Sequence, residues 1–337
     1  MSKITFTLML FLSISSIYAQ ENIEAIIEKG IEFHDAGEYE KAIEAYKSAL
    51  KIDPKSEVAN YEMALTYFHK KDYKKSIKYS DKVIKQKSTN MRMAYVTKGS
   101  SLDLLGKTKE SIKLFEEAIK ETQPHYLLYY NLALNYYKIN KFDKAEENLL
   151  GAIDLNLSHS SSHLMLANIY LARNKKIQSL LSLHYFLFLE PTGPRAADAY
   201  SLVQEQMNNS VKKDKDQPNT FNISFSGDHN SEFMAAELMI SMLEATKTLE
   251  ENKDKSEEEM FVENTKGVFQ MLHDMKEDKT QNIWWKFYIP FFYEIADSEH
   301  FETYCKYISI SGDGAAQEWL DENPDKVEAF AKWLEMK

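Results

Sequence analysis

The sequence has little of what breaks helices or cross-links a fold. Its 337 residues include 10 glycines, 7 prolines and one cysteine, Cys305. One cysteine cannot form an internal disulfide, so the fold depends on apolar packing alone. Few helix breakers, together with 12% aromatic residues, are typical of a helical protein with a substantial core. The length predicts about two domains, at roughly 150 residues each.

Arginine is also scarce, with 3 residues against 38 lysines. Arginine is the residue that recognises phosphate and guanine in a bidentate manner. Because the net charge is also −11, we expect no nucleic-acid partner. The charge is uneven: residues 1–219 carry a net charge of +3 and residues 220–337 one of −14. The acidic half could repel polyanions, attract a basic partner or simply keep the chain soluble, and the last interpretation is the simplest.

Long apolar runs are limited to one, Ile4–Ile14, which follows Lys3. Small and polar residues then lead to Ala19, a plausible cleavage site before Gln20. This order is typical of a secretory signal peptide, and the run is shorter than the roughly 20 apolar residues that span a bilayer. We therefore predict a signal peptide over residues 1–19 and a protein that is exported, periplasmic or secreted. An uncleaved anchor is the alternative.

A 34-residue pattern begins at Ile23 and recurs five times. With Ile23 as position 1, small residues occupy positions 8, 20 and 27, aromatic residues positions 11, 17 and 24, and a proline position 32. Position 8 is Gly30, Ala64, Gly99, Ala133 and Ala167. The turn position is Gly37, Lys71, Gly106, Asn140 and Asn174. Most of these turn residues tolerate a positive φ, which a tight connection between two helices requires.

This pattern resembles the tetratricopeptide repeat, a pair of antiparallel helices with small residues where the helices cross. The resemblance implies an all-α fold with an α-solenoid of about five helix-turn-helix repeats. The predicted repeats are residues 23–56, 57–91, 92–125, 126–159 and 160–193. A further helix over residues 194–207 would close the last repeat, because the end of a solenoid exposes apolar surface.

The remaining residues resemble no family. Residues 208–220 are polar and predict a linker, and residues 221–337 predict an acidic helical domain of unknown type. Residues 221–225 alternate like a strand, but a surface-lying extended segment is favoured over an isolated strand. Helical patterns continue over residues 231–251, 259–276, 298–310, 315–321 and 326–337.

The tetratricopeptide resemblance also implies a binding surface. In that family, positions 2, 5, 9 and 12 of each first helix line the concave face of the solenoid. The corresponding candidates here are largely apolar or aromatic: Ile27, Ile31, Tyr61, Leu65, Phe68, Tyr130, Leu134, Tyr137, Leu164 and Asn168. Members that clamp a peptide's terminal carboxylate use lysine at position 5 and asparagine at position 9 of their first repeat. Ile27 and Ile31 occupy those positions, which disfavours that mode.

An apolar groove left bare would promote aggregation. We therefore predict a protein partner that covers it, either an amphipathic helix or an extended peptide. The alternative is that the C-terminal half of the same chain fills the groove.

The stretch Trp284–Tyr293 holds seven aromatic residues in ten. One interpretation is a recognition site for a protein, or for a sugar stacked on Trp284 or Trp285. The other is a core helix kinked at Pro290. The core interpretation is favoured, because aromatic side chains supply large buried areas and this half has few other strong core segments.

Titratable residues form no convincing catalytic or metal group. His159 and His163 are four residues apart, as helical zinc ligands can be, but His163 falls at a packing position of its repeat. Asp228-His229, followed by Glu232 and Glu237, is interpreted as solvated charge. We predict no catalytic residue, no metal site and no cofactor.

Cys305 lies between aromatic residues and is predicted to be a buried, inert thiol. The sequence as a whole predicts an exported scaffold or adaptor rather than an enzyme. The alternative from another class is an enzyme whose active site lies in residues 221–337 and is docked by the repeats.

Overall fold

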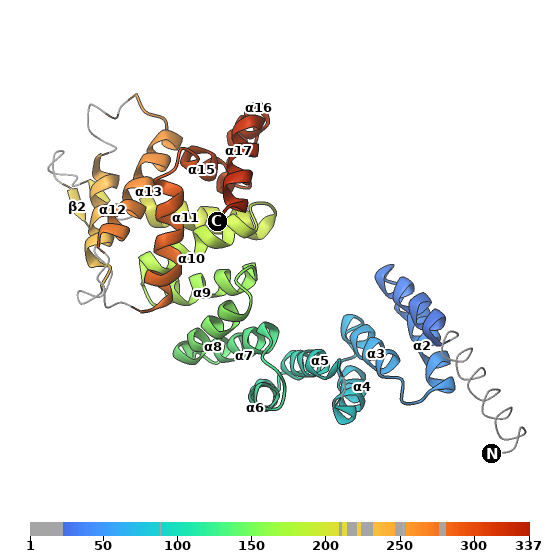
Figure 1. Cartoon of the computed structure of the whole chain (residues 1–337). Helices are drawn as coiled ribbons and strands as arrows, with labels where there is room; N and C mark the ends of the chain where they lie inside the picture. The colour runs from blue at the N-terminus through green and yellow to red at the C-terminus, as the bar shows by residue number, and fades with distance from the viewer. Residues whose placement is uncertain are drawn as a thin grey trace, which may run out of the picture. The chain divides into compact units, whose positions relative to one another are not determined.

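The computed structural model describes residues 23–87, 89–208, 211–213, 221–223, 232–246, 252, 254–275 and 281–337. The predicted signal peptide lies outside the described residues. The chain forms two compact units that divide between Leu155 and Asn156, and each unit is described by itself (Figure 1).

The first unit consists of consecutive helix pairs. Residues 23–35 are helical. The helices that follow are α2 (Tyr39–Ile52), α3 (Glu57–His69), α4 (Tyr73–Gln86), α5 (Met91–Leu104), α6 (Thr108–Glu121), α7 (Tyr126–Lys138) and α8 (Phe142–Leu155). Each helix packs against the next, and the first helices of successive repeats also touch, α3 against α5 and α5 against α7. This arrangement confirms the predicted all-α solenoid of helix pairs.

The turn inside each predicted repeat has the same backbone conformation. The turn residue has a positive φ in all five: Gly37, Lys71, Gly106, Asn140 and Asn174. The N–H of the next residue then donates to the carbonyl of position 11, as Lys107 does to Leu102 at 2.9 Å. This is the hydrogen bond that closes a helix ending in a left-handed residue. Lys71 adopts the conformation although lysine does not favour it.

The small residues of the pattern are where the helices cross. In the first repeat Ala42 and Ala49 of α2 are fully buried beside Tyr46. A Cβ added at Gly30 would overlap the ring of Tyr46, so only glycine fits there. The predicted pairing of small and aromatic positions is therefore a packing requirement.

The second unit begins with the fifth predicted repeat. Its helices are α9 (Ser160–Ala172), α10 (Lys176–Leu189), α11 (Pro194–Asn208), α12 (Met234–Thr246), α13 (Glu257–Asp274), the π-helix η2 (Trp284–Tyr288), α14 (Ile289–Ala296), α15 (Phe301–Ser309), α16 (Gly314–Glu322) and α17 (Pro324–Glu335). Within the residues that the structure describes, helices follow most of the helical patterns expected of the C-terminal half. α13 begins with a capping box between Ser256 and Glu259.

Helix α10 is the centre of this unit. Eleven of its 14 residues are buried, because α9, α11, α12, α15 and η2 all pack against it. A helix that is apolar on every side must be buried on every side. The C-terminal helices therefore share one core with the fifth repeat, and α11 packs on α10 where the closing helix was expected.

Two short strands interrupt the helices. β1 (Val211–Lys213) lies within the predicted linker and pairs antiparallel with β2 (Phe221–Ile223), with Lys212 opposite Asn222. The extended segment predicted at residue 221 thus has a partner strand that sequence patterning did not reveal. Among the described helices, none combines the length and apolar character that crossing a membrane requires.

Candidate functional site

The predicted groove residues lie on the first helices of the repeats. Ile27 is buried, with 6% of its surface exposed, and the other nine candidates are half-buried. Positions 5, 9 and 12 share one helix face because they are three or four residues apart. Helix α3 thus presents Tyr61, Leu65 and Phe68 together. Helix α7 presents Tyr130, Leu134 and Tyr137 in the same way, and α5 lies between the two helices.

Two of the three groove positions on α5, between these two apolar groups, are polar: Ser100 and Asp103, with Val96 at the third. Ser100 Oγ donates to Asn131 Oδ1 of α7 at 3.2 Å. Asp103 accepts a hydrogen bond from Thr108 Oγ1 at 2.9 Å and forms an ion pair with Lys138. We call Ser100, Asp103, Asn131 and Lys138 the polar band. Its groups satisfy one another, so the band separates two apolar surfaces without leaving a buried charge unpaired.

A titratable group at the first two repeats was not predicted from the sequence. Burial raises the pKa of Glu62 to about 7, and the nearby charge of Asp35 acts in the same direction. His34, at groove position 12, bonds through Nδ1 to Thr66 Oγ1 at 2.7 Å, and its ring contacts that of His69 edge-on. The sequence shows only that two acidic residues, Asp35 and Glu62, occupy position 13 of the first repeat and position 6 of the second. Both effects favour the neutral carboxyl form of Glu62 at this end of the predicted groove.

In the second unit, Leu164 and Asn168 of α9 are half-buried. The C-terminal helices reach α9 at other positions. His163 Nδ1 is 2.6 Å from the hydroxyl of Tyr288, and the ring of Tyr170 packs edge-on against Trp284. These contacts occupy positions 4 and 11 of the fifth repeat rather than the groove positions 5 and 9.

The aromatic stretch forms core, as the favoured interpretation predicted. Trp284 and Trp285 are 5% and 3% exposed, and Trp285 Nε1 donates to Glu232 Oε2 at 2.8 Å. The hypothesis of a sugar stacked on either indole was therefore wrong, because neither ring offers a free face. A π-helical turn, Trp284–Tyr288, precedes Pro290. Proline has no backbone N–H to donate to the preceding turn, and a π-helical turn lets the helix continue without that hydrogen bond.

Two histidines are buried between the fifth repeat and the C-terminal helices. His184 Nδ1 is 2.9 Å from the hydroxyl of Tyr304, and burial lowers the pKa of His184 to about 3. His163 is held by Tyr288 and by the carbonyl of Leu157, 2.8 Å from Nε2, and burial lowers its pKa to about 4. Both histidines are thus neutral hydrogen-bonding residues of the core.

The remaining candidates are explained by packing. His159 Nδ1 is 2.8 Å from Ser162 Oγ, and no group of three or more His, Cys, Asp or Glu in the described ranges could hold a metal ion. Cys305 is buried, as predicted, and burial raises its thiol pKa. Glu237 is only 5% exposed, so its interpretation as solvated charge was wrong. Asp228-His229 lies outside the described residues.

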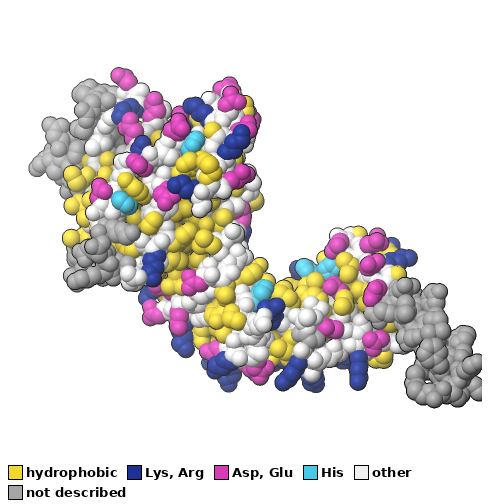
Figure 2. All heavy atoms as spheres, viewed as in Figure 1, with side chains coloured by type: hydrophobic (Ala, Val, Ile, Leu, Met, Phe, Trp, Pro, Cys, Tyr) yellow, Lys and Arg dark blue, Asp and Glu magenta, His cyan; other side chains and the backbone are white. Residues whose placement is uncertain are grey.

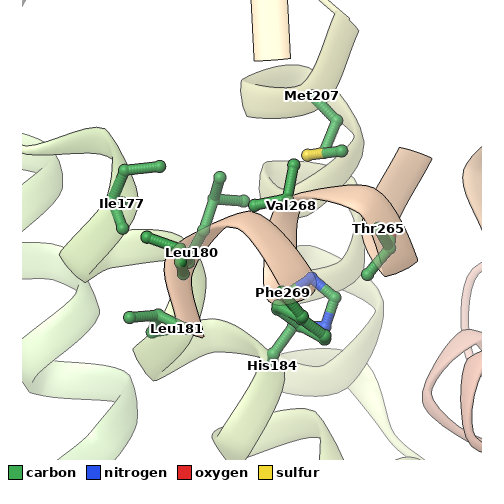
Figure 3. A pocket seen from close by; sticks show the side chains of 9 residues that line it. Ile177, Leu180, Leu181, His184, Met207, Thr265, Val268 and Phe269 are labelled. Atoms are coloured by element: carbon green, nitrogen blue, oxygen red, sulfur yellow. The ribbon is translucent and has the colours of Figure 1, made fainter. Parts of the chain in front are cut away.

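A cavity beside His184 is too small to hold a substrate. Its volume is about 10 Å³, room for about one water molecule. Figure 3 shows its lining, mostly apolar side chains from α10, α11 and α13. Thr265 contributes a buried hydroxyl that has no hydrogen-bond partner.

Comparison with known proteins agrees with the geometry of the repeats. Residues 30–71 match the family description "TPR repeat", and residues 58–90, 94–124 and 130–177 match "Tetratricopeptide repeat". The matched residues between 30 and 177 are therefore tetratricopeptide repeats. Arrays of this class present extended concave surfaces and serve as scaffolds for protein–protein interaction.

Individual relatives match only parts of the chain. "TPR repeat-containing protein MJ1428" of Methanocaldococcus jannaschii is 26% identical over 163 residues, 46% of this chain and 29% of that protein. "Probable UDP-N-acetylglucosamine--peptide N-acetylglucosaminyltransferase SPINDLY" of Hordeum vulgare is 30% identical over 132 residues, 37% of this chain and 14% of that protein. The match thus spans less than a third of the length of either relative.

Among solved structures, the chain is similar to one described as "Functional Characterization of Pseudomonas Aeruginosa pilF". That structure is 19% identical, covers 56% of this chain and 88% of its own, and has a TM-score of 0.49.

Proposed function

We propose that this chain is an exported adaptor that binds a partner protein along the groove of its repeats. The groove is formed by Tyr61, Leu65 and Phe68 of α3 and by Tyr130, Leu134 and Tyr137 of α7. The observation that carries the proposal is the partial exposure of these six apolar and aromatic side chains on α3 and α7, two first helices that both pack against α5. Half-buried tyrosines of this kind supply large contact area at low entropic cost and are enriched in binding hot spots.

The polar band indicates what such a partner looks like. Its α5 members, Ser100 and Asp103, lie between the α3 and α7 groups, so a bound segment places apolar side chains at its two ends and a polar residue between them. Interaxial distances of about 9 Å between packed helices place the two groups roughly 18 Å apart. An amphipathic helix covers that distance with about 12 residues, and an extended peptide with about 6.

The test is a crosslinking pulldown with the full chain and a pair of substitutions, Tyr61→Ala with Tyr130→Ala. We expect the variant to lose partner recovery by more than tenfold, because each tyrosine truncated at a hot spot costs more than about 1 kcal/mol. The matched control is Tyr79→Ala with Tyr129→Ala, which removes two half-buried tyrosines away from the groove positions. Both variants must keep the thermal unfolding midpoint of the wild type within a few degrees.

Two results count against the proposal. Partner recovery that is unchanged in the groove variant contradicts protein binding at this face. A groove variant that loses stability while its control does not indicates that the chain's own C-terminal half covers the groove.

Export is tested separately by the mass of the chain recovered from its native cell. We expect a protein in the envelope fraction or the medium that begins at Gln20. A chain that keeps residues 1–19 contradicts the predicted cleavage after Ala19 and leaves the groove proposal untouched.

A further inference from the structure

Helix α4 carries a high density of positive charge, and none of its lysines is at a groove position. Its 14 residues include five lysines and one acidic residue, Asp81, a net charge of +4. Counted in the same way, α2, α6, α8 and α10, the second helices of the other repeats, carry +1, −1, −3 and +1. Figure 2 shows lysine and arginine side chains projecting along the edge of the first unit that includes α4.

Four of these lysines lie on one face of the helix. At 3.6 residues per turn, Lys74, Lys78, Lys82 and Lys85 fall within an arc of about 80° and form a row about 16 Å long. We call these four residues the lysine row. All four are exposed. The one acidic residue beside the row, Asp81, is already engaged by Lys98 of α5 at 2.7 Å.

The positive charge of the row is not neutralised. Among the ion pairs of the described residues, none includes Lys74, Lys78, Lys82 or Lys85. Lys82 instead donates to Asn60 Oδ1 at 3.1 Å and lies over the ring of Tyr79. Partial desolvation of its side chain and the neighbouring Lys78 both lower the pKa of Lys82. Like charges four residues apart weaken a helix, so the row is unfavourable for folding alone.

We propose that the lysine row binds the surface of an anionic lipid bilayer. Four to eight basic residues on one helix face are the pattern that binds anionic headgroups. A straight helix brings the whole row against a flat surface at once. Lysine also acts as a point charge, whereas an interface built to pair with protein carboxylates favours the forked donors of arginine. The row therefore fits a diffuse anionic surface better than a set of specific carboxylates on a protein.

The test uses the full chain and two kinds of vesicle, pure phosphatidylcholine and phosphatidylcholine with 30% phosphatidylglycerol, in a sedimentation assay. The NaCl concentration is varied from about 50 to 300 mM, a range over which electrostatic screening increases strongly. We expect binding to the anionic vesicles that weakens steeply with salt. Any contribution of the apolar residues 4–14 is common to all variants and to both vesicle types.

The decisive variant is Lys74→Glu with Lys78→Glu and Lys85→Glu. At roughly fivefold per lysine, we expect it to weaken binding to anionic vesicles by on the order of 100-fold. The matched control is Lys109→Glu with Lys113→Glu and Lys120→Glu on α6, which makes the same charge change on exposed lysines of the next repeat. The control should retain binding within a few fold.

Three results would overturn the proposal. An equal loss in both variants would show that only net charge matters. Equal binding to both vesicle types would show that the row does not select anionic lipid. A row variant that binds vesicles normally but loses a crosslink to an acidic protein would assign the row to a protein partner.

Discussion

The side chain of Phe115 lies where a side chain at Gly99 would have to be. Gly99 is on α5 and Phe115 on α6, and a Cβ added at Gly99 would overlap the phenyl ring. Gly30 and Tyr46 have the same relationship in the first repeat. The other three repeats combine alanine at position 8 with a smaller residue at position 24: Ala64 with Ser80, Ala133 with Leu149, and Ala167 with Leu183. The volumes at the two positions therefore compensate each other.

This compensation predicts the result of a double-mutant cycle. Gly99→Ala should lower the free energy of unfolding by about 1–3 kcal/mol, because an inserted methyl group overpacks the crossing. In the background of Phe115→Leu, which copies the fourth and fifth repeats, the same substitution should be nearly neutral. Urea unfolding of the four chains measures the coupling. Additive effects of the two substitutions would mean that the positions do not share one space.

The two buried histidines predict how stability depends on pH. Their pKa values of about 4 for His163 and about 3 for His184 lie below the value of about 6.5 in an unfolded chain. The unfolded chain therefore binds more protons below pH 6.5, and the free energy of unfolding falls as the pH falls. Each histidine contributes a slope of roughly 1.0 to 1.3 kcal/mol per pH unit between pH 6 and pH 4.5.

Chemical denaturation at several pH values measures this slope. His184→Gln should flatten it by about one histidine's share, even though the variant is less stable. Leu183→Ala on the same helix is the control, because Leu183 is fully buried and not titratable, so this variant should lower stability and leave the slope unchanged. A wild-type stability that is flat between pH 6 and pH 4.5 would contradict the burial of both neutral rings.

The hydroxyl of Thr265 predicts a stabilising substitution. It is buried without a partner beside the cavity of about 10 Å³. Thr265→Val keeps the shape of the side chain and removes the unsatisfied group, so the free energy of unfolding should stay level or rise by about 1 kcal/mol. Thermal unfolding measures the change. Thr66→Val is the contrasting variant: because Thr66 is hydrogen-bonded to His34, this substitution should lower stability. A loss at Thr265 would reveal a hydrogen-bonded water in the cavity.

The position of α10 predicts where the chain can be divided. Residues 156–337 should unfold cooperatively, because they form one compact unit. Residues 208–337 should not, since their removal from α9–α11 leaves Tyr288 and Tyr304 without His163 and His184. Circular dichroism with urea titration of both fragments tests this. Cooperative unfolding of the shorter fragment would contradict this and would place the domain boundary at the predicted linker, residues 208–220.

Sequence alone predicted the repeats well, because the same local pattern recurs in all five. Gly37, Gly106, Asn140 and Asn174 marked turns through their tolerance of positive φ, and even Lys71 follows the register they define. The C-terminal half was harder, because its packing depends on long-range contacts. Nothing in the local pattern of His184 shows that it bonds to Tyr304, 120 residues away.

The groove was predicted from family positions, and the structure adds details that no position implied. The polar band depends on α5 and α7 lying side by side, so Asn131 meets Ser100 only in three dimensions. The raised pKa of Glu62 likewise depends on its burial and on the charge of Asp35 in the preceding repeat. Periodicity reports which residues share a helix face but not which charges become buried there.

The central claim is that the groove of the repeats binds a protein partner. The most direct measurement is photocrosslinking in the native cell, with benzoylphenylalanine in place of Leu65 in the groove and in place of Tyr79 on α4. We predict that the Leu65 position yields one discrete intermolecular adduct that Tyr130→Ala abolishes, and that the Tyr79 position does not yield it. Equal adducts at both positions, or none at Leu65, would contradict the account.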